Sequence, residues 1–446
     1  MGYESEYRQK LRRPEEAVKV IKNGDYVDYG LGLGMPDLLD KALAARKEEL
    51  SDIKIRSMYS MRPVAVVECD PKRETFTYSS WQLSGQDRAY FDRGLCSYNA
   101  GVYRYQPVYY RRYLPVDVAM IMVSPMDREG YFSFSFINSS QKAACDKAGI
   151  VIVEVCPNMP RVFGGYDDRI HISQVDYIVE GGDTPLAEIP PIEPTETDRR
   201  IAENIMPYIE DGANIQLGIG GMPNVIGMMI AQSDLKDLGM YTEMTCDGFA
   251  DMYYAGKITN KYNRVGQGRG VYSVALGSKK LYEWAAENPQ LASFPVDFVN
   301  SPKVMAENDK LTCIVNCVSV DLYSQISSES SGTRQISGTG GQVDFVQGAF
   351  DSEGGKCFIC LSSTRKDKQG NLQSRITPML KSGEIVSTPR SLGFYLATEY
   401  GVVNLAGRST WERAEMVISL AHPDFREELI QKAQEMNIWR RSNKLR

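Results

Sequence analysis

Two short segments of the chain share one pattern of apolar, glycine and proline positions. Residues 23–43 read NGDYVDYGLGLGMPDLLDKAL, and residues 211–230 read DGANIQLGIGGMPNVIGMMI. Aligning Gly30 with Gly218 and allowing a gap of one residue also aligns their two Gly-Met-Pro triplets. Each copy predicts an apolar strand, a glycine-rich turn and a helix with a proline in its first turn. The repeat therefore indicates two related halves, each built from such βα units.

Further apolar runs of strand length alternate with helical patterns in both halves. They cover residues 116–125, 148–156 and 175–181 in the first half, and residues 310–322 and 356–363 in the second. Strands that alternate with helices are typical of open, mostly parallel sheets. We therefore expect an α/β fold.

A proline-rich stretch separates the two halves. Residues 184–197 carry four prolines and have neither helical nor strand periodicity, which is typical of a linker. We expect an N-terminal domain of residues 1–190 and a C-terminal domain of residues 191–446, both open-sheet α/β domains of related structure. A ligand cleft would then lie between them, near the carboxyl ends of their strands.

Composition narrows the possible classes of function. The 446 residues are 43% hydrophobic and 24% charged, as in an ordinary soluble protein, and no apolar run approaches the roughly 20 residues that span a bilayer. The first 20 residues mix both charge signs and lack the apolar core of a secretory signal. A net charge of -6 argues against general attraction to nucleic acid. We expect a cytoplasmic protein with neither a membrane nor a nucleic acid as its partner.

Cysteine and histidine usage restricts the chemistry. Nine scattered cysteines indicate reduced thiols, and Cys357 and Cys360 lie in a strand-like run that predicts core positions. With only His171 and His422, the chain has no histidine-rich metal site and few bases for a serine or cysteine nucleophile. We therefore expect no metal.

Two glycine-dense loops are candidate binding elements. Residues 216–224 (QLGIGGMPN) end a strand and start a helix, so their backbone N–H groups can point at an anion or an oxyanion. The same letters also suit a tight turn, and the copy at residues 30–36 shows that geometry alone can retain them. Residues 337–345 (SGTGGQVDF) suit either a loop around an extended ligand or a flexible connection. Neither loop matches the usual ATP or dinucleotide patterns.

Glu243 is the candidate for a reactive group. It lies in residues 241–248 (YTEMTCDG), after an apolar run and before a helix expected near Asp247. This places it at the carboxyl end of a strand, although a solvent-facing glutamate near a helix start explains the same spacing.

Three cations follow the second glycine loop. Arg365, Lys366 and Arg375 could meet the phosphates of a nucleotide, or they could be solvated charges on a hairpin that turns at Gln369 and Gly370. The sequence leaves both interpretations open.

Taken in order, these motifs resemble the class I CoA-transferases, in the acetyl-CoA hydrolase/transferase branch that includes butyryl-CoA:acetate and 4-hydroxybutyrate CoA-transferases. The resemblance covers nearly the whole chain. It includes QLGIGGMPN, YTEMTCDG, SPKVMAENDKLTCIVNCVSVDLYSQISSES, SGTGGQVDFVQGA, LSSTRKDKQGNLQSRITP and ATEYGVVNLAGRSTWERA.

The resemblance implies roles for particular residues. Glu243 matches the glutamate that attacks the acyl-CoA, Gly341 matches a glycine whose backbone N–H holds the oxyanion, and Asn300 matches a polar active-site residue. Lys366 matches a lysine near the CoA phosphates. The residues implied to contact CoA are Gly218, Gly220, Gly221, Met222, Pro223, Asn224, Gly340 and Gly341.

The resemblance also implies an activity. CoA would pass from a short-chain acyl-CoA, most of all butyryl-CoA, to acetate through a glutamyl-CoA thioester, so that CoA is both substrate and covalent intermediate. Family members form homodimers or homotetramers. Alternatives are a hydrolase of the same fold, a transferase for propionyl-CoA or 4-hydroxybutyryl-CoA, and a non-catalytic acyl-CoA sensor. A sugar-phosphate isomerase is more distant, because the loop at residues 337–342 has no role there.

Overall fold

The computed structural model describes residues 2–190, 192–218 and 220–439. The chain divides into two compact units: Met1–Ile189 with Val271–Val299, and Pro190–Gly270 with Asn300–Arg446. Residues 271–299 belong to the first unit, which no pattern in the sequence predicted. The domain bounds of 1–190 and 191–446 stay a prediction.

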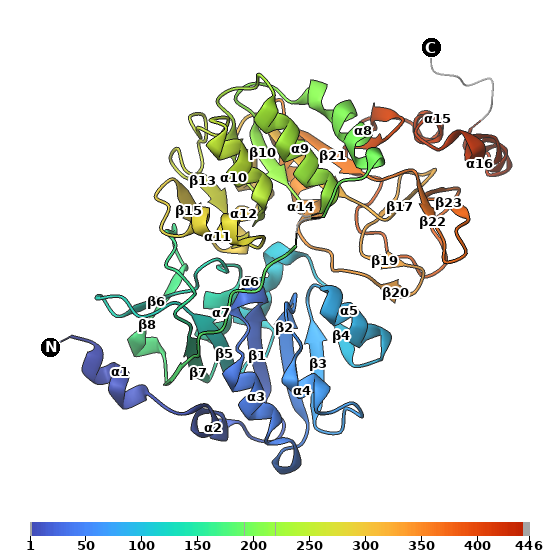
Figure 1. Cartoon of the computed structure of the whole chain (residues 1–446). Helices are drawn as coiled ribbons and strands as arrows, with labels where there is room; N and C mark the ends of the chain where they lie inside the picture. The colour runs from blue at the N-terminus through green and yellow to red at the C-terminus, as the bar shows by residue number, and fades with distance from the viewer. Residues whose placement is uncertain (1, 191, 219, 440–446) are drawn as a thin grey trace. The chain divides into compact units, whose positions relative to one another are not determined.

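The first unit is built on a seven-stranded sheet in which every neighbouring pair is parallel (Figure 1). Its strand order is β4-β3-β2-β1-β5-β7-β9. The strands are β1 (Tyr26–Leu31), β2 (Ile53–Met58), β3 (Phe76–Ser80), β4 (Cys96–Tyr98), β5 (Val118–Val123), β7 (Ile150–Val155) and β9 (Tyr177–Glu180). Three of them confirm the runs predicted at residues 116–125, 148–156 and 175–181.

Short helices surround this sheet, and smaller β pairs lie beside it. The helices are α1 (Glu4–Lys10), α2 (Pro14–Ala17), α3 (Leu38–Ala44), α4 (Ala65–Glu68), α5 (Gly85–Asp92), α6 (Gln106–Arg112), α7 (Gln141–Lys147), α11 (Lys279–Ala285) and α12 (Val296–Val299). The smaller pairs join β6 (Tyr131–Ser133) to β8 (Arg169–His171), and β13 (Gly270–Tyr272) to β15 (Leu291–Ser293). A further strand of this unit is β14 (Val274–Ala275).

Alternate residues of β5 enter two different cores. Val118 and Met120 pack with side chains of α3 and α4, whereas Ala119 and Ile121 pack with side chains of α6 and α7. This follows from the period of two along a strand, which sends neighbouring side chains to opposite faces. Helices therefore cover both faces of the sheet, as expected for a parallel α/β sheet.

The second unit carries a six-stranded sheet of order β11-β10-β16-β21-β25-β26. Its pairs are parallel except β25 with β26. The strands are β10 (Asn214–Leu217), β11 (Gly239–Met240), β16 (Leu311–Asn316), β21 (Lys356–Cys360), β25 (Tyr395–Thr398) and β26 (Gly401–Asn404). The predicted run at residues 356–363 is β21, where Cys357 and Cys360 are buried free thiols, as expected.

Helices and small β pairs complete this unit. The helices are α8 (Glu196–Ile205), α9 (Gly221–Gln232), α10 (Asp247–Tyr254), α13 (Pro302–Met305), α14 (Gln342–Asp351), α15 (Thr410–Ser419) and α16 (Pro423–Glu435). The short strands are β12 (Met244–Thr245), β17 (Ser319–Asp321), β18 (Ile326–Ser327), β19 (Ser330–Ser331), β20 (Arg334–Gln335), β22 (Thr364–Lys366), β23 (Leu372–Ser374) and β24 (Ile376–Thr377). The predicted run at residues 310–322 thus becomes β16 and β17, which lie in different sheets.

The sequence repeat forms the same element order in both units. In the first, β1 leads through a tight turn at Gly32–Gly34 into α3, and in the second, β10 leads through a glycine loop into α9. Pro223 lies in the first turn of α9, as predicted, whereas α3 begins two residues after Pro36, so the prediction is wrong for the first copy.

The described residues of the proline-rich stretch form no helix or strand up to Thr195. Pro191 lies outside the described residues. Thr195 caps α8, so the last two residues of the predicted linker are helical. Within the described ranges, no helix has both the length and the apolar character needed to cross a bilayer.

Candidate functional site

The structure brings together Glu243, Asn300 and Gly341, three residues that are distant in sequence. The Asn300 Nδ2 donates to Glu243 Oε2 at 2.5 Å. A Cβ atom placed on Gly341 would lie 2.0 Å from Glu243 Oε2 and 2.3 Å from Asn300 Nδ2. Only glycine allows this approach, since real Cβ contacts are never so short. The carboxylate of Glu243 therefore lies directly against the backbone of Gly341.

Glu243 owes its place to the strand that precedes it. β11 runs parallel to β10, and Tyr241 continues the pairing by donating its backbone N–H to the Ile215 carbonyl. The Thr242 hydroxyl then donates to the Met244 carbonyl at 2.9 Å, which turns the chain at Glu243. The glutamate is thus at the carboxyl end of a strand, and α10 begins at Asp247, as predicted.

Asn300 is held by short helices on the other side of the carboxylate. It precedes α13, which packs on α14 so closely that a Cβ on Gly348 would lie 2.3 Å from Met305 Sδ. Gly341 is the N-cap of α14. The contact of α13 with α14 therefore holds Asn300 and Gly341 in one place.

The environment of Glu243 tunes its protonation. Burial raises the pKa of its carboxyl to about 7, while the hydrogen bond from Asn300 acts in the opposite direction because it favours the anion. Asn300 is fully buried, and Glu243 keeps some contact with solvent. The N-terminus of α14 at Gly341 adds a partial positive charge that also favours the carboxylate. Both protonation states are accessible near neutral pH.

The first glycine loop of this unit is open. Gly220 is the N-cap of α9 with φ 122°, in the region that favours glycine. The atom closest to a Cβ placed there is Asn316 Nδ2, at 3.8 Å. Met222 and Pro223 are buried, and Asn224 Oδ1 is buried without a partner in the described part of the chain. Gly218 and Gly221 also have room around them, with no atom closer than 3.4 Å to a Cβ placed there.

Asn316 and Gln342 connect the two glycine loops, and sequence reasoning missed both as site residues. The Gln342 Nε2 donates to the Asn316 carbonyl at 2.9 Å, and its Oε1 accepts from the hydroxyls of Ser328 at 2.6 Å and Thr388 at 3.0 Å. Two signals could have found them: Asn316 is a polar residue that interrupts the apolar run of residues 310–322, and Gln342 directly follows Gly341.

Lys366 lies apart from this cluster. It ends β22, is exposed, and forms no hydrogen bond or ion pair with Glu243 or the glycine loops among the described residues. β22 pairs with β23 across a turn that contains Gly370 at φ 86°, which is the predicted hairpin. The role of Lys366 near the CoA phosphates stays a prediction.

Arg375 is a second cation of the segment that follows the second glycine loop. Its guanidinium is partly buried, its Nε has no partner in the described ranges, and burial lowers its pKa. Asp198 is among the charges that act on it, and the Asp198 Oδ2 lies 3.4 Å from a Cβ placed on Gly221.

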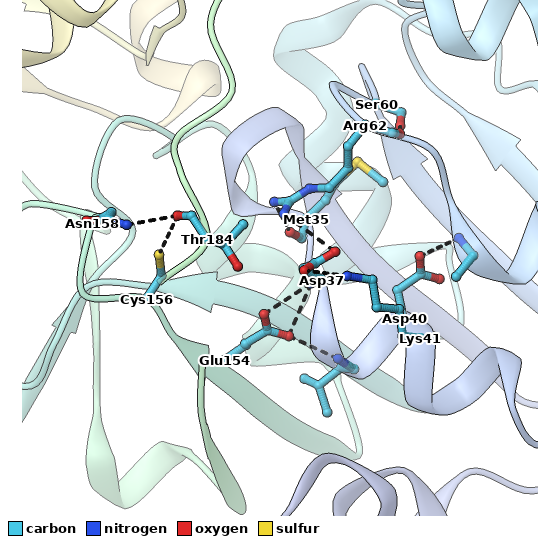
Figure 2. Close-up of polar contacts among 12 residues, drawn as sticks. Met35, Asp37, Asp40, Lys41, Ser60, Arg62, Glu154, Cys156, Asn158 and Thr184 are labelled. Carbon is cyan, nitrogen blue, oxygen red and sulfur yellow. Dashed lines mark hydrogen bonds and ion pairs between the residues drawn. The ribbon is translucent and has the colours of Figure 1, made fainter. Parts of the chain in front are cut away.

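The copy of the loop in the first unit is closed by the protein itself. Both oxygens of Glu154 accept from the backbone N–H of Asp37, and one also accepts from Leu39, so the carboxylate caps α3 (Figure 2). The Gln141 side chain fills the turn, since a Cβ on Gly30 or Gly34 would lie 2.3 or 2.7 Å from its Nε2. Glu154 is fully buried, and desolvation raises its pKa. This turn has its own internal anion and no room for another.

Across the described residues, no group of three or more histidine, cysteine or carboxylate side chains is arranged to hold a metal ion.

Comparison with known proteins identifies the family. Residues 1–190 match the model of the acetyl-CoA hydrolase/transferase N-terminal domain, and residues 277–433 match that of its C-terminal domain. The chain is 48% identical over its full length, and over all of the relative, to a butyryl-CoA:acetate CoA-transferase of Anaerostipes caccae. It is 46% identical to a probable butyrate:acetyl-CoA coenzyme A-transferase of Syntrophomonas wolfei, with 99% of this chain and 98% of that protein covered.

A solved structure gives the same result. The crystal structure of RipA from Yersinia pestis superposes with a TM-score of 0.90 at 34% identity, covering 98% of this chain and 100% of that chain. The predicted fold class and the predicted branch of CoA-transferases are therefore confirmed. The chain belongs to the acetyl-CoA hydrolase/transferase family of enzymes.

Proposed function

We propose that this CoA-transferase moves CoA from butyryl-CoA to acetate through a thioester on Glu243. The observation that carries the mechanism is the carboxylate of Glu243 with a pKa of about 7, hydrogen-bonded by Asn300 and lying against the backbone of Gly341. The choice of butyryl-CoA and acetate rests on the two relatives of 48% and 46% identity.

The first half-reaction loads CoA onto the enzyme. An oxygen of Glu243 attacks the thioester carbonyl carbon of butyryl-CoA, the C–S bond breaks, and a butyryl-glutamyl anhydride and CoA thiolate form. The thiolate then attacks the glutamyl carbonyl carbon, which forms the glutamyl-CoA thioester and releases butyrate. Carboxylates and thiolates exchange here without net proton transfer, so no histidine base is required.

The second half-reaction reverses these steps with acetate. An acetate oxygen attacks the glutamyl thioester, giving an acetyl-glutamyl anhydride and CoA thiolate. The thiolate attacks the acetyl carbonyl carbon, and acetyl-CoA leaves with restoration of the Glu243 carboxylate. Kinetics are of the ping-pong type.

Each tetrahedral intermediate places negative charge on the oxygen of the carbonyl under attack, which belongs to the acyl group in some steps and to Glu243 in others. The backbone N–H of Gly341, at the N-terminus of α14, is the donor that we assign to this oxyanion. Gly340 has φ 55° and no atom within 4 Å of a Cβ placed there, which leaves space for the substrate at this turn. Residues 218–224 would hold the CoA portion, together with a cation of the 365–375 segment, Lys366 or Arg375.

The main alternative is a hydrolase, in which water resolves the glutamyl thioester. The family description includes hydrolases as well as transferases. Propionyl-CoA and 4-hydroxybutyryl-CoA are alternative donors. A non-catalytic acyl-CoA sensor would have no use for a carboxylate with a pKa near 7. Cytoplasmic location and a homodimer or homotetramer complete the proposal.

The test measures transfer and hydrolysis together. Purified enzyme is mixed with butyryl-CoA with and without acetate, and acetyl-CoA and free thiol are both quantified. We expect acetyl-CoA to form at the rate at which butyryl-CoA disappears, with little thiol in the absence of acetate. Rapid thiol release without acetate would favour the hydrolase, and full exchange by Glu243→Ala would refute the assigned nucleophile.

A further inference from the structure

Glu329 is a buried carboxylate that the mechanism above does not use. It is 4% exposed and lies in the polar stretch SSESSG, immediately before β19. Sequence alone indicates a solvated loop there. A buried carboxylate is costly unless its oxygens accept hydrogen bonds, so its partners define its function.

The partners of Glu329 all belong to the segments around the second glycine loop. Gln335 Nε2 donates to Oε2 at 3.1 Å, and the Ser387 hydroxyl donates to Oε1 at 2.9 Å. The Thr339 hydroxyl lies 3.4 and 3.5 Å from the two oxygens. Three side chains from two segments thus converge on one carboxylate, and Thr339 lies two residues before Gly341.

The backbone of Glu329 makes a second set of contacts with the same loop. Its carbonyl accepts from the N–H groups of Ile336 at 2.7 Å and Ser337 at 3.3 Å. The Gln335 Nε2 that binds the carboxylate also donates to the Ser337 carbonyl at 3.1 Å. Both the backbone and the side chain of Glu329 therefore bind the end of the β19–β20 hairpin and the start of the loop.

The residue before Glu329 extends the network to the other end of the loop. The Ser328 hydroxyl donates to Gln342 Oε1 at 2.6 Å, and the Ser337 hydroxyl donates to the Ser328 carbonyl at 3.3 Å. Residues 337–342 are therefore anchored at both ends. Gly340, in between, has φ 55° and no side chain to fix it.

We propose that Glu329 is a positioning residue for the reaction: its buried carboxylate holds the loop of residues 337–341 so that the Gly341 backbone faces Glu243. It acts through the loop and does not touch substrate. This inference rests on the proposed function, because it takes Glu243 as the nucleophile and Gly341 as the oxyanion donor.

The first test replaces Glu329 with glutamine. An amide keeps the size but removes the charge and leaves one acceptor oxygen for the three partners, which weakens the hydrogen bonds from Gln335, Thr339 and Ser387, so the loop should shift. We expect kcat to fall on the order of 10-fold to 100-fold, as for small misplacements of a reacting geometry. KM for butyryl-CoA should change by less than about threefold, because the loss is confined to the transition state.

Asp321→Asn is the matched control. Asp321 is also fully buried and also accepts from a glutamine, since Gln325 Nε2 donates to its Oδ2 at 2.8 Å. Its other partners are the backbone N–H groups of Tyr323, Gln325 and Leu380, outside the glycine loop. This variant should lose thermal stability while its folded fraction keeps the wild-type kcat.

A second pair of variants keeps the test decisive if Glu329→Gln folds poorly. Thr339→Val keeps the branched shape but removes the hydroxyl, and Thr339→Ser keeps the hydroxyl. We expect the serine variant to retain near wild-type kcat and the valine variant to lose several-fold.

The rate at which the CoA thioester forms on Glu243 in a single turnover separates the possible failures. Slow formation in Glu329→Gln beside normal formation in Asp321→Asn supports the positioning role. Equal kcat in both variants, or equal kcat in Thr339→Val and Thr339→Ser, overturns it. Absence of the thioester in the wild-type enzyme overturns the proposed function itself.

Discussion

The two copies of the glycine turn share a sequence pattern and an element order, but one is filled by a side chain and the other has room around its glycines. In the first unit, Gln141 fills the turn between β1 and α3, and the carboxylate of Glu154 caps the helix. In the second unit, the loop between β10 and α9 places Gly220 at the N-cap of the helix, and this residue brings no capping side chain. The start of α3 is thus capped by a carboxylate of the chain, whereas the described residues provide no side-chain cap for α9.

The contrast extends to the carboxylates. Glu154 is fixed by backbone N–H groups and serves the fold, whereas Glu243 has one side-chain partner, Asn300, and lies against a glycine. Both have raised pKa values because both are desolvated. Desolvation alone therefore does not identify a reactive carboxylate. What distinguishes Glu243 is that it lies against the backbone of a glycine.

The largest effect is expected from adding one methyl group beside Glu243, with the same change in the closed turn of the first unit as the comparison. Gly341→Ala should lower kcat about 10²-fold to 10³-fold, because the new Cβ occupies the position of the Glu243 carboxylate and displaces the oxyanion donor. The companion change Gly34→Ala forces Gln141 to move and should act on the free energy of unfolding, by about 1 to 3 kcal/mol. Steady-state kinetics and thermal melts on both variants check this, and equal kcat losses would abolish the distinction between the site at Glu243 and the closed turn.

A smaller effect is expected on the pH dependence of the first half-reaction. Attack requires the carboxylate, so the rate should rise with pH and level off above about 7, the pKa of Glu243. Asn300→Ala removes the hydrogen bond that favours the anion, so the midpoint should move to higher pH and the rate at pH 7 should fall about tenfold. Stopped-flow release of butyrate across pH 5.5 to 9 measures both; an unchanged midpoint would contradict the assigned role of Asn300.

The closed copy should respond in stability. Glu154→Gln places an amide where a carboxylate accepts three backbone hydrogen bonds, and should cost about 1 to 2 kcal/mol of unfolding free energy. Urea unfolding is the measurement, with kcat per folded molecule as the comparison. A stable variant would show that α3 does not depend on its internal anion.

The smallest expected effect is a gain in stability when the Glu243 carboxylate is replaced by an amide. The pKa of Glu243 is about 7 in the folded chain, above its usual value of 4.5, so the folded state binds the proton more tightly than the unfolded chain. Stability from this group is therefore present at low pH and is lost as pH rises through about 7. Glu243→Gln should be more stable than wild type at pH 8 by about 1 kcal/mol, since the side chain is partly exposed, with no gain at pH 5. A gain independent of pH would contradict the assigned titration.

Much of this architecture could be predicted from the sequence, because it depends on local patterns. Apolar runs gave β5, β7, β16 and β21, and the repeat gave the strand–turn–helix order in both units. One helix start was predicted wrongly: Pro223 lies in the first turn of α9, but Pro36 precedes α3 by two residues. Backbone hydrogen bonds and caps decide that start, and they depend on tertiary partners such as Glu154.

The site was predictable only in part. Glu243, Asn300 and Gly341 were named from a resemblance, and the structure brings them into contact. Glu329 lies in a stretch that carries the family resemblance, but its burial was not predicted, because a glutamate among serines is typical of a solvated loop. Its burial results from contacts with Gln335, Thr339 and Ser387, some of them distant in sequence.

Intact mass measurement of the enzyme mixed with butyryl-CoA tests the central claim most directly. We expect a mass increase equal to CoA less one water, located by peptide mapping to Glu243, absent in Glu243→Gln and removed when acetate is added. Transfer of CoA to acetate by enzyme that never carries this adduct would contradict the account.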